Sequence, residues 1–148
     1  MHELRELYQQ VILDHNHSPR NFGKPDKYNH TAEGDNPLCG DHIDIYLLVE
    51  DNIIQDIRFD GKGCAISKAS ASLMTSELKG KTVAEAQALF ERFHDLVTGE
   101  VVADPGSIGK LEVLSGVKDF PMRVKCASLA WHTMKEALSG EEKTVSTE

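Results

Sequence analysis

The sequence has few cysteines, a shortage of basic residues and no long apolar run, and each shortage excludes a class of protein. Three cysteines in 148 residues are too few, and odd in number, for a framework of disulfides. No apolar run approaches the roughly 20 residues that span a membrane. Only 16 Lys and Arg accompany 24 Asp and Glu, giving a formal net charge of −8. We therefore expect no membrane segment and no non-specific binding of nucleic acid, which requires a positive field.

The start of the chain also lacks the features of a secretory signal. Residues 1–13 are amphipathic and carry acidic side chains early, so we expect a cytoplasmic protein whose thiols stay reduced. A length of 148 residues allows one domain with a substantial core and is short for two. We expect a single domain over residues 1–139 and a polar, flexible tail over residues 140–148.

Apolar periodicity predicts an α+β fold. Alternation of apolar and polar residues indicates a β-hairpin, and a weaker pattern indicates a first strand before it. Helical spacing follows in most of the remaining chain, and a capping box begins one of the helices. The expected strands cover residues 28–34, 43–49 and 53–59, and the expected helices cover residues 3–15, 65–78, from Thr82 to Val97, 106–117 and 121–139. We expect a small antiparallel sheet of about three strands with helices packed against one face.

Some polar residues on the predicted helices receive a structural interpretation. His15 lies on the apolar face of the first helix, where a hydrogen-bonded packing histidine is expected. Ser67, Ser70 and Ser72 follow the second cysteine and are within reach of a site there. Serines on a half-exposed helix, which is what we expect here, need no function.

Two cysteines lie beside backbone features that suit an ionised thiol. Cys39 lies in an irregular loop shaped by Pro37 and Gly40, and such a loop is costly to order unless a site needs its shape. Cys64 follows a Gly-Lys-Gly turn at the amino end of a predicted helix. Unpaired N–H groups and the helix dipole at that end favour a thiolate over a thiol.

The third cysteine, Cys126, has two cations close by in the sequence. Arg123 and Lys125 precede it and favour the ionised thiol. The cysteines thus suit a metal site because of the residues around each of them. Their spacing adds little, since no Cys-x-x-Cys pair is present. The alternative is that all of them are inert residues that fill a core as small apolar side chains.

Three thiolates and one carboxylate make a complete tetrahedral shell for zinc, and a carboxylate follows the first cysteine at Asp41. His42 is its nearest competitor. If the strand has already begun, alternation points these two side chains to opposite faces, and we favour Asp41. Lys125 is excluded as a ligand because a protonated amine has no lone pair for a metal.

Four segments carry a resemblance to a known family. They are Asp14-His15 with Pro19-Arg20-Asn21 and Gly23, residues 34–41 (GDNPLCGD), residues 61–67 (GKGCAIS) and residues 120–131 (FPMRVKCASLAW). In these segments the chain resembles the IscU/NifU-like family of iron–sulfur cluster assembly proteins, and within it the SufU branch of zinc-dependent sulfurtransferases. Together they are spread over most of the chain.

Departures from the scaffold branch of that family favour the SufU branch. Scaffolds carry a histidine directly before the third cysteine, where this chain has Lys125. They also carry a Leu-Pro-Pro-Val-Lys segment, which is replaced here by residues 120–124. The stretch between Cys64 and Cys126 is longer than in scaffolds, consistent with the helix expected over residues 106–117.

The resemblance implies a fold, a site and a partner. By position, the zinc ligands are Cys39, Asp41, Cys64 and Cys126. Cys39 is then the sulfur acceptor, and Arg123 steadies the local negative charge during transfer. The implied donor is a PLP-dependent cysteine desulfurase, and downstream iron–sulfur assembly proteins collect the sulfur. Two other interpretations stay open: a scaffold that builds a [2Fe–2S] cluster on the three cysteines, and a purely structural zinc domain.

Overall fold

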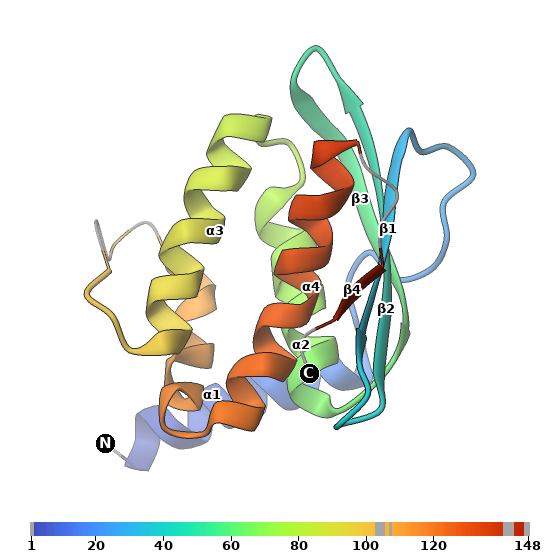
Figure 1. Cartoon of the computed structure of the whole chain (residues 1–148). Coiled ribbons are helices and arrows are strands. Elements are labelled where there is room, and N and C mark those ends of the chain that lie inside the picture. The colour runs from blue at the N-terminus through green and yellow to red at the C-terminus, as the bar shows by residue number, and fades with distance from the viewer. Residues whose placement is uncertain (1, 103–105, 107, 141–143, 147–148) are drawn as a thin grey trace.

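The computed structural model describes residues 2–102, 106, 108–140 and 144–146, with only the backbone for residues 2–7 and 144–146. Its helices pack against one face of a single sheet (Figure 1), so the predicted α+β class is confirmed. The elements are α1 (His2–His17), β1 (His30–Asn36), β2 (Asp41–Glu50), β3 (Ile53–Lys62), α2 (Ala65–Leu78), α3 (Val83–Thr98), η2 (Gly109–Asp119), α4 (Pro121–Ser139) and β4 (Thr144–Ser146). Within the described residues, no helix is long and apolar enough to cross a membrane.

The sheet has the strand order β3-β2-β1-β4, and its first three strands are antiparallel. Asp51 and Asn52 both have positive φ angles, 53° and 62°, which suit the two-residue turn of a tightly twisted hairpin. The other turn, between β1 and β2, brings Asn36 opposite Asp41. This register places the loop that contains Cys39 at one end of the sheet.

The fourth strand, β4, lies in the expected tail. It pairs in parallel with β1, with Gly34 opposite Val145. Four strands therefore form the sheet in place of about three, because a three-residue strand is too short to leave an alternating pattern. Of the tail over residues 140–148, positions 141–143 and 147–148 lie outside the described residues, so its flexibility stays a prediction.

Helix α2 lies at the centre of the helical layer, and the expectation that it is half-exposed is wrong. Ser67, Ser70, Ser72 and Thr75 are all fully buried. The small buried side chains of α2 let α1, α4 and β3 pack closely against it. Ser70 uses its buried hydroxyl between elements, because its Oγ donates to the carbonyl oxygen of Ala127 on α4 at 2.6 Å, whereas Ser67 Oγ has no partner among the described residues.

The segment after α1 is anchored on α2 and β3. Ser72 Oγ accepts the backbone N–H of Arg20 at 2.8 Å and lies 2.7 Å from His15 Nδ1, so His15 is the hydrogen-bonded packing histidine that the sequence predicts. Asn21 has a left-handed φ of 55°, and its carbonyl accepts the N–H of Phe59 at 3.1 Å. This covers part of the free edge of β3.

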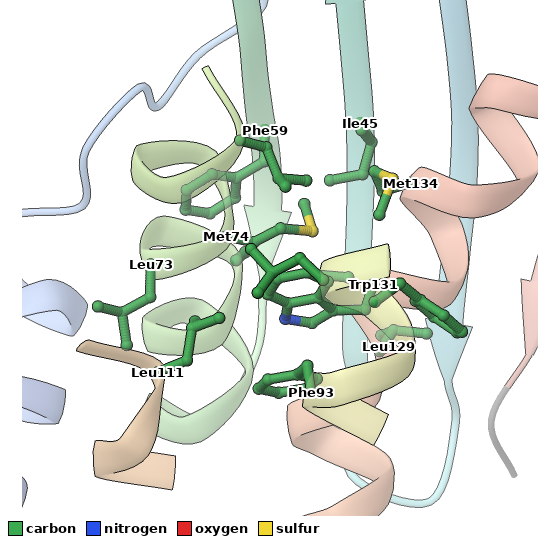
Figure 2. Close-up of a cluster of buried hydrophobic side chains, with 14 of the residues drawn as sticks. Ile45, Phe59, Leu73, Met74, Phe93, Leu111, Leu129, Trp131 and Met134 are labelled. Carbon is green, nitrogen blue, oxygen red and sulfur yellow. The ribbon is translucent and has the colours of Figure 1, made fainter. Parts of the chain in front are cut away.

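The main core lies between the sheet and the helices. Figure 2 shows Trp131 of α4 beside Phe93 of α3 and Met74 of α2. The Trp131 and Phe93 rings stack with centroids 4.5 Å apart, and both side chains are buried. Stacked aromatic rings contribute about 0.5–1.5 kcal/mol beyond their buried area.

The helix expected over residues 106–117 is present as a 3₁₀ helix, η2, that begins and ends later. Residues 103–105 and 107 lie outside the described residues. The buried side chains of η2 include Leu111, Leu114 and Val117, which are spaced by three. That spacing aligns side chains on one face of a helix with three residues per turn, which explains why this segment departs from the α-helix.

Replacing Ser72 with Ala removes the partner of two buried polar groups, Arg20 N–H and His15 Nδ1. We expect the free energy of unfolding to fall by about 1–3 kcal/mol, measured by urea denaturation. Ser76→Ala is the control, because Ser76 Oγ only adds a bond to the Ser72 carbonyl oxygen within the same helix. Equal losses in the two variants would contradict the structure.

Burial, followed by the charge of Arg20, lowers the pKa of His15. The unfolded chain therefore takes up a proton below the ordinary pKa of about 6.5 while the folded protein resists it, so stability falls as the pH falls. We expect His15→Asn, which keeps an acceptor near Nδ1, to lose less stability between pH 7 and pH 5.5 than the unchanged protein. Thermal unfolding at each pH measures this, with the exposed His17→Asn as control; parallel pH profiles would refute the assignment.

Candidate metal centre

Four side chains proposed as metal ligands converge at the end of the sheet where α2 begins. Cys126 Sγ lies 3.3 Å from Cys39 Sγ. Asp41 Oδ1 accepts the backbone N–H of Cys64 at 2.8 Å, and Asp41 Oδ2 lies 3.9 Å from Cys64 Sγ. The ligands come from the β1–β2 loop, the first residue of β2, the residue before α2 and the first half of α4.

The donor set fits a tetrahedral zinc ion. One ligand atom from each of Cys39, Asp41 and Cys126 lies within 4.8 Å of the others. Zn–S bonds of about 2.3 Å in a tetrahedron place neighbouring sulfurs roughly 3.8 Å apart, and the sulfurs of Cys39 and Cys126 are 3.3 Å apart. Cys64 lies outside that trio but is connected to it through Asp41.

Asp41 is buried, with 2% of its surface exposed, and glycine makes room for it. A Cβ atom at Gly63 would lie 2.5 Å from Asp41 Oδ1, and one at Gly61 would lie 2.0 Å from the carbonyl oxygen of His42. Gly61 also has a φ of 135°, which favours glycine. The Gly-Lys-Gly turn is therefore needed for the carboxylate to approach the start of α2.

Cys64 is the N-cap of α2. Its Sγ accepts the backbone N–H of Ser67 at 3.4 Å. A donor of this kind, together with the positive end of the helix dipole, stabilises a thiolate. The sequence analysis predicted this environment, and the structure shows it.

Cys126 behaves differently from the expectation. It is 3% exposed, and burial raises its pKa, with further contributions from Cys39, Asp41 and Cys64. Arg123 is exposed and its guanidinium lies 4.4 Å from the centre of the Phe120 ring. Side chains on a helix lean toward its N-terminus, which carries Arg123 away from the inward-facing sulfur. The environment of Cys126 therefore disfavours the ionised thiol, contrary to what its cationic sequence neighbours predicted.

The structure separates Asp41 from His42 as strand alternation predicts. His42 lies on the outer face of the sheet, where Nδ1 contacts Asp35 Oδ1 at 2.7 Å and Nε2 contacts Asp44 Oδ1 at 3.0 Å. The hydrogen bond to Asp35 is the main cause that raises the pKa of His42. His42 therefore faces away from the cysteines, and Asp41 faces them.

The structure adds one neighbour that the sequence analysis did not identify. Asn36 is fully buried at the end of β1, and its Nδ2 donates to Cys126 Sγ at 3.8 Å. It lies directly opposite Asp41 in the sheet register. Its position three residues before Cys39 was the available signal, but only the pairing of β1 with β2 shows that it reaches Cys126.

Comparison with known proteins connects this site to a family. Residues 7–127 match the family of the NifU-like N terminal domain. The zinc-dependent sulfurtransferase SufU of Bacillus subtilis (strain 168) is 40% identical over 139 residues, 94% of each chain. The iron–sulfur cluster assembly scaffold protein IscU of Thermotoga maritima is 43% identical over 132 residues, 89% of this chain and 92% of the relative.

A solved structure of an iron–sulfur cluster assembly protein is also similar to this chain. The crystal structure of a putative iron–sulfur cluster assembly scaffold protein for the SUF system from Fervidobacterium islandicum AW-1 is 35% identical. It superimposes with a TM-score of 0.83 and covers 87% of this chain and 94% of its own. The chain therefore belongs to the NifU-like N-terminal domain family.

Proposed function

We propose that the protein is a zinc-dependent sulfurtransferase. In this proposal it accepts persulfide sulfur from a PLP-dependent cysteine desulfurase in the reducing cytoplasm and delivers it to downstream iron–sulfur assembly proteins. The main support is the unequal anchoring of the three thiols. Cys126 is buried on α4 and the partly exposed Cys64 caps α2, whereas Cys39, also partly exposed, lies in a loop beside the exposed Leu38 and Gly40.

Cys39, Asp41, Cys64 and Cys126 would hold the zinc ion, which when bound keeps the thiols ionised at neutral pH. The protein's own contribution is to place one thiol where a second protein can reach it. Gly40 has a φ of 72°, and a Cβ atom at this position would meet open space, with no heavy atom beyond its chain neighbours within 4 Å. In this proposal the loop carries Cys39 outward while the other three ligands stay in place.

The proposed transfer is a thiol–persulfide exchange. The Cys39 thiolate attacks the outer sulfur of the desulfurase persulfide and forms a new S–S bond. The bond between that sulfur and the donor cysteine breaks, and the donor leaves as a thiolate. One sulfur atom moves, and no external oxidant or reductant is needed.

Arg123 has a supporting role in this proposal. Among the described residues it has no ion pair, and its guanidinium lies over Phe120. Phe120 and Met122 beside it are exposed. We assign Arg123 to the surface that receives the desulfurase, where its charge offsets that of the incoming persulfide, rather than to a direct contact with the ligands.

A second candidate function is a scaffold for a [2Fe–2S] cluster. Soft thiolates bind iron–sulfur units as well as zinc, and one relative above is named as such a scaffold. Lys125 stands where scaffolds of the resembling family carry a histidine, which supports sulfur transfer. A colourless preparation with about one zinc per chain supports the transferase, and a brown anaerobic preparation supports the scaffold.

Removing the Asp41 carboxylate should weaken the metal site. We expect Asp41→Ala to bind zinc at least about tenfold more weakly, since losing even an outer partner costs 10–100-fold. Competition with a chromogenic chelator measures this, after purification without a metal-binding tag. His42→Ala is the matched control from the next residue and should retain its zinc. The reverse pattern would reassign the fourth ligand to His42.

Replacing Cys39 with Ala should abolish acceptance of sulfur. Mass spectrometry after incubation with a cysteine desulfurase and cysteine should show one added sulfur on the unchanged protein and none on Cys39→Ala. The alanine variant should remain folded, because Cys39 lies in a partly exposed loop. A persulfide of equal abundance in both proteins would overturn the assignment of Cys39 as the acceptor.

A further inference from the structure

The three thiols differ in the hydrogen-bond donors that the protein provides. Cys64 Sγ accepts the backbone N–H of Ser67, and Cys126 Sγ accepts Nδ2 of Asn36. Among the described residues, no N–H group donates to Cys39 Sγ, whose polar contact is the thiol of Cys126. Two of the sulfurs are therefore supplied with N–H donors and the third is not.

Asn36 is held in place to make this contact. It is fully buried, and its backbone carbonyl accepts the N–H of Cys39 at 3.1 Å. Its Oδ1 atom is buried and has no partner among the described residues. An unpaired buried amide oxygen is destabilising, so an aliphatic residue would be the more stable choice here. The hydrogen bond that the amide nitrogen donates to Cys126 Sγ explains why an amide is present here.

An N–H donor changes the chemistry of a thiolate. A hydrogen bond donated to the charged form takes up lone-pair density of the sulfur and stabilises the anion. Density held in such a bond is less available for attack on another sulfur. A sulfur with a donor is therefore a poorer nucleophile and a more persistent anion than one without.

We propose that Asn36 is a positioning residue that makes Cys126 an unreactive, permanent metal ligand and leaves Cys39 as the reactive thiolate. Asn36 provides for Cys126 what the N-terminus of α2 provides for Cys64. Through its backbone it also sets the loop in which Cys39 lies. This inference rests on the proposed sulfur transfer, because it explains why one of three similar thiols is the acceptor.

The test compares Asn36→Leu, which keeps the shape and loses the donor, with Asn36→Ala as a second variant if leucine disturbs folding. Ser70→Ala is the matched control, since Ser70 is buried and bonds the carbonyl of Ala127 without contacting a sulfur. Each protein is loaded with Co²⁺ for absorption spectra. Each zinc-loaded protein is also alkylated with iodoacetamide and mapped by mass spectrometry.

We expect the thiolate-to-cobalt charge-transfer band to move to longer wavelength in the Asn36 variants, because an unbonded sulfur is more electron-rich. The ratio of alkylation at Cys39 to that at Cys126 should fall several-fold, and zinc affinity should fall about 10–100-fold. Ser70→Ala should match the unchanged protein in all three measurements.

Spectra and alkylation ratios in the Asn36 variants equal to those of the unchanged protein would overturn the inference, as would a shift of the same size in Ser70→Ala. Binding of Co²⁺ by the unchanged protein without thiolate bands would overturn it too. These measurements need no desulfurase. A normal Asn36 effect with no persulfide on the unchanged protein would instead refute the proposed function.

Discussion

The hydrogen bond from the Cys64 backbone N–H to the Asp41 carboxylate is the contact on which the site depends. It joins the first residue of β2 to the start of α2, so one buried acid ties the sheet to the central helix. The approach is close enough that Gly63 has no room for a side chain. A buried carboxylate is costly unless it is paired or bonded to a metal. The same contact therefore fixes the fold locally and places a buried carboxylate beside the thiols.

Two of the three cysteines lie at helices, and the third lies in a loop. Cys64 caps a fully packed helix, and Cys126 lies on α4, which Ser70 of α2 holds through the Ala127 carbonyl. Cys39 lies in a short loop between β1 and β2 beside exposed residues. Such a division suits a metal that stays with the protein while one ligand reacts.

Much of the secondary structure could be predicted because it depends on local patterns. Residues 65–78 and 121–139 were expected as helices and coincide with α2 and α4, since a glycine turn and Pro121 mark their starts. The capping box of Thr82 and Glu85 is present with both of its hydrogen bonds. The burial of α2 was missed because serines are polar in sequence, and their hydroxyl partners lie on α1 and α4. The strand β4 was missed because three residues carry too little pattern.

The sequence by itself determined which residues could bind a metal, because the thiols, the carboxylate and the glycines beside them can be read directly from it. It also determined that Asp41 and His42 face opposite sides, because strand alternation is local. Only the tertiary structure decided that Asn36 reaches Cys126, 90 positions away in the chain. That contact depends on how α4 packs against the end of the sheet, and no local pattern encodes the distance between two elements far apart in sequence.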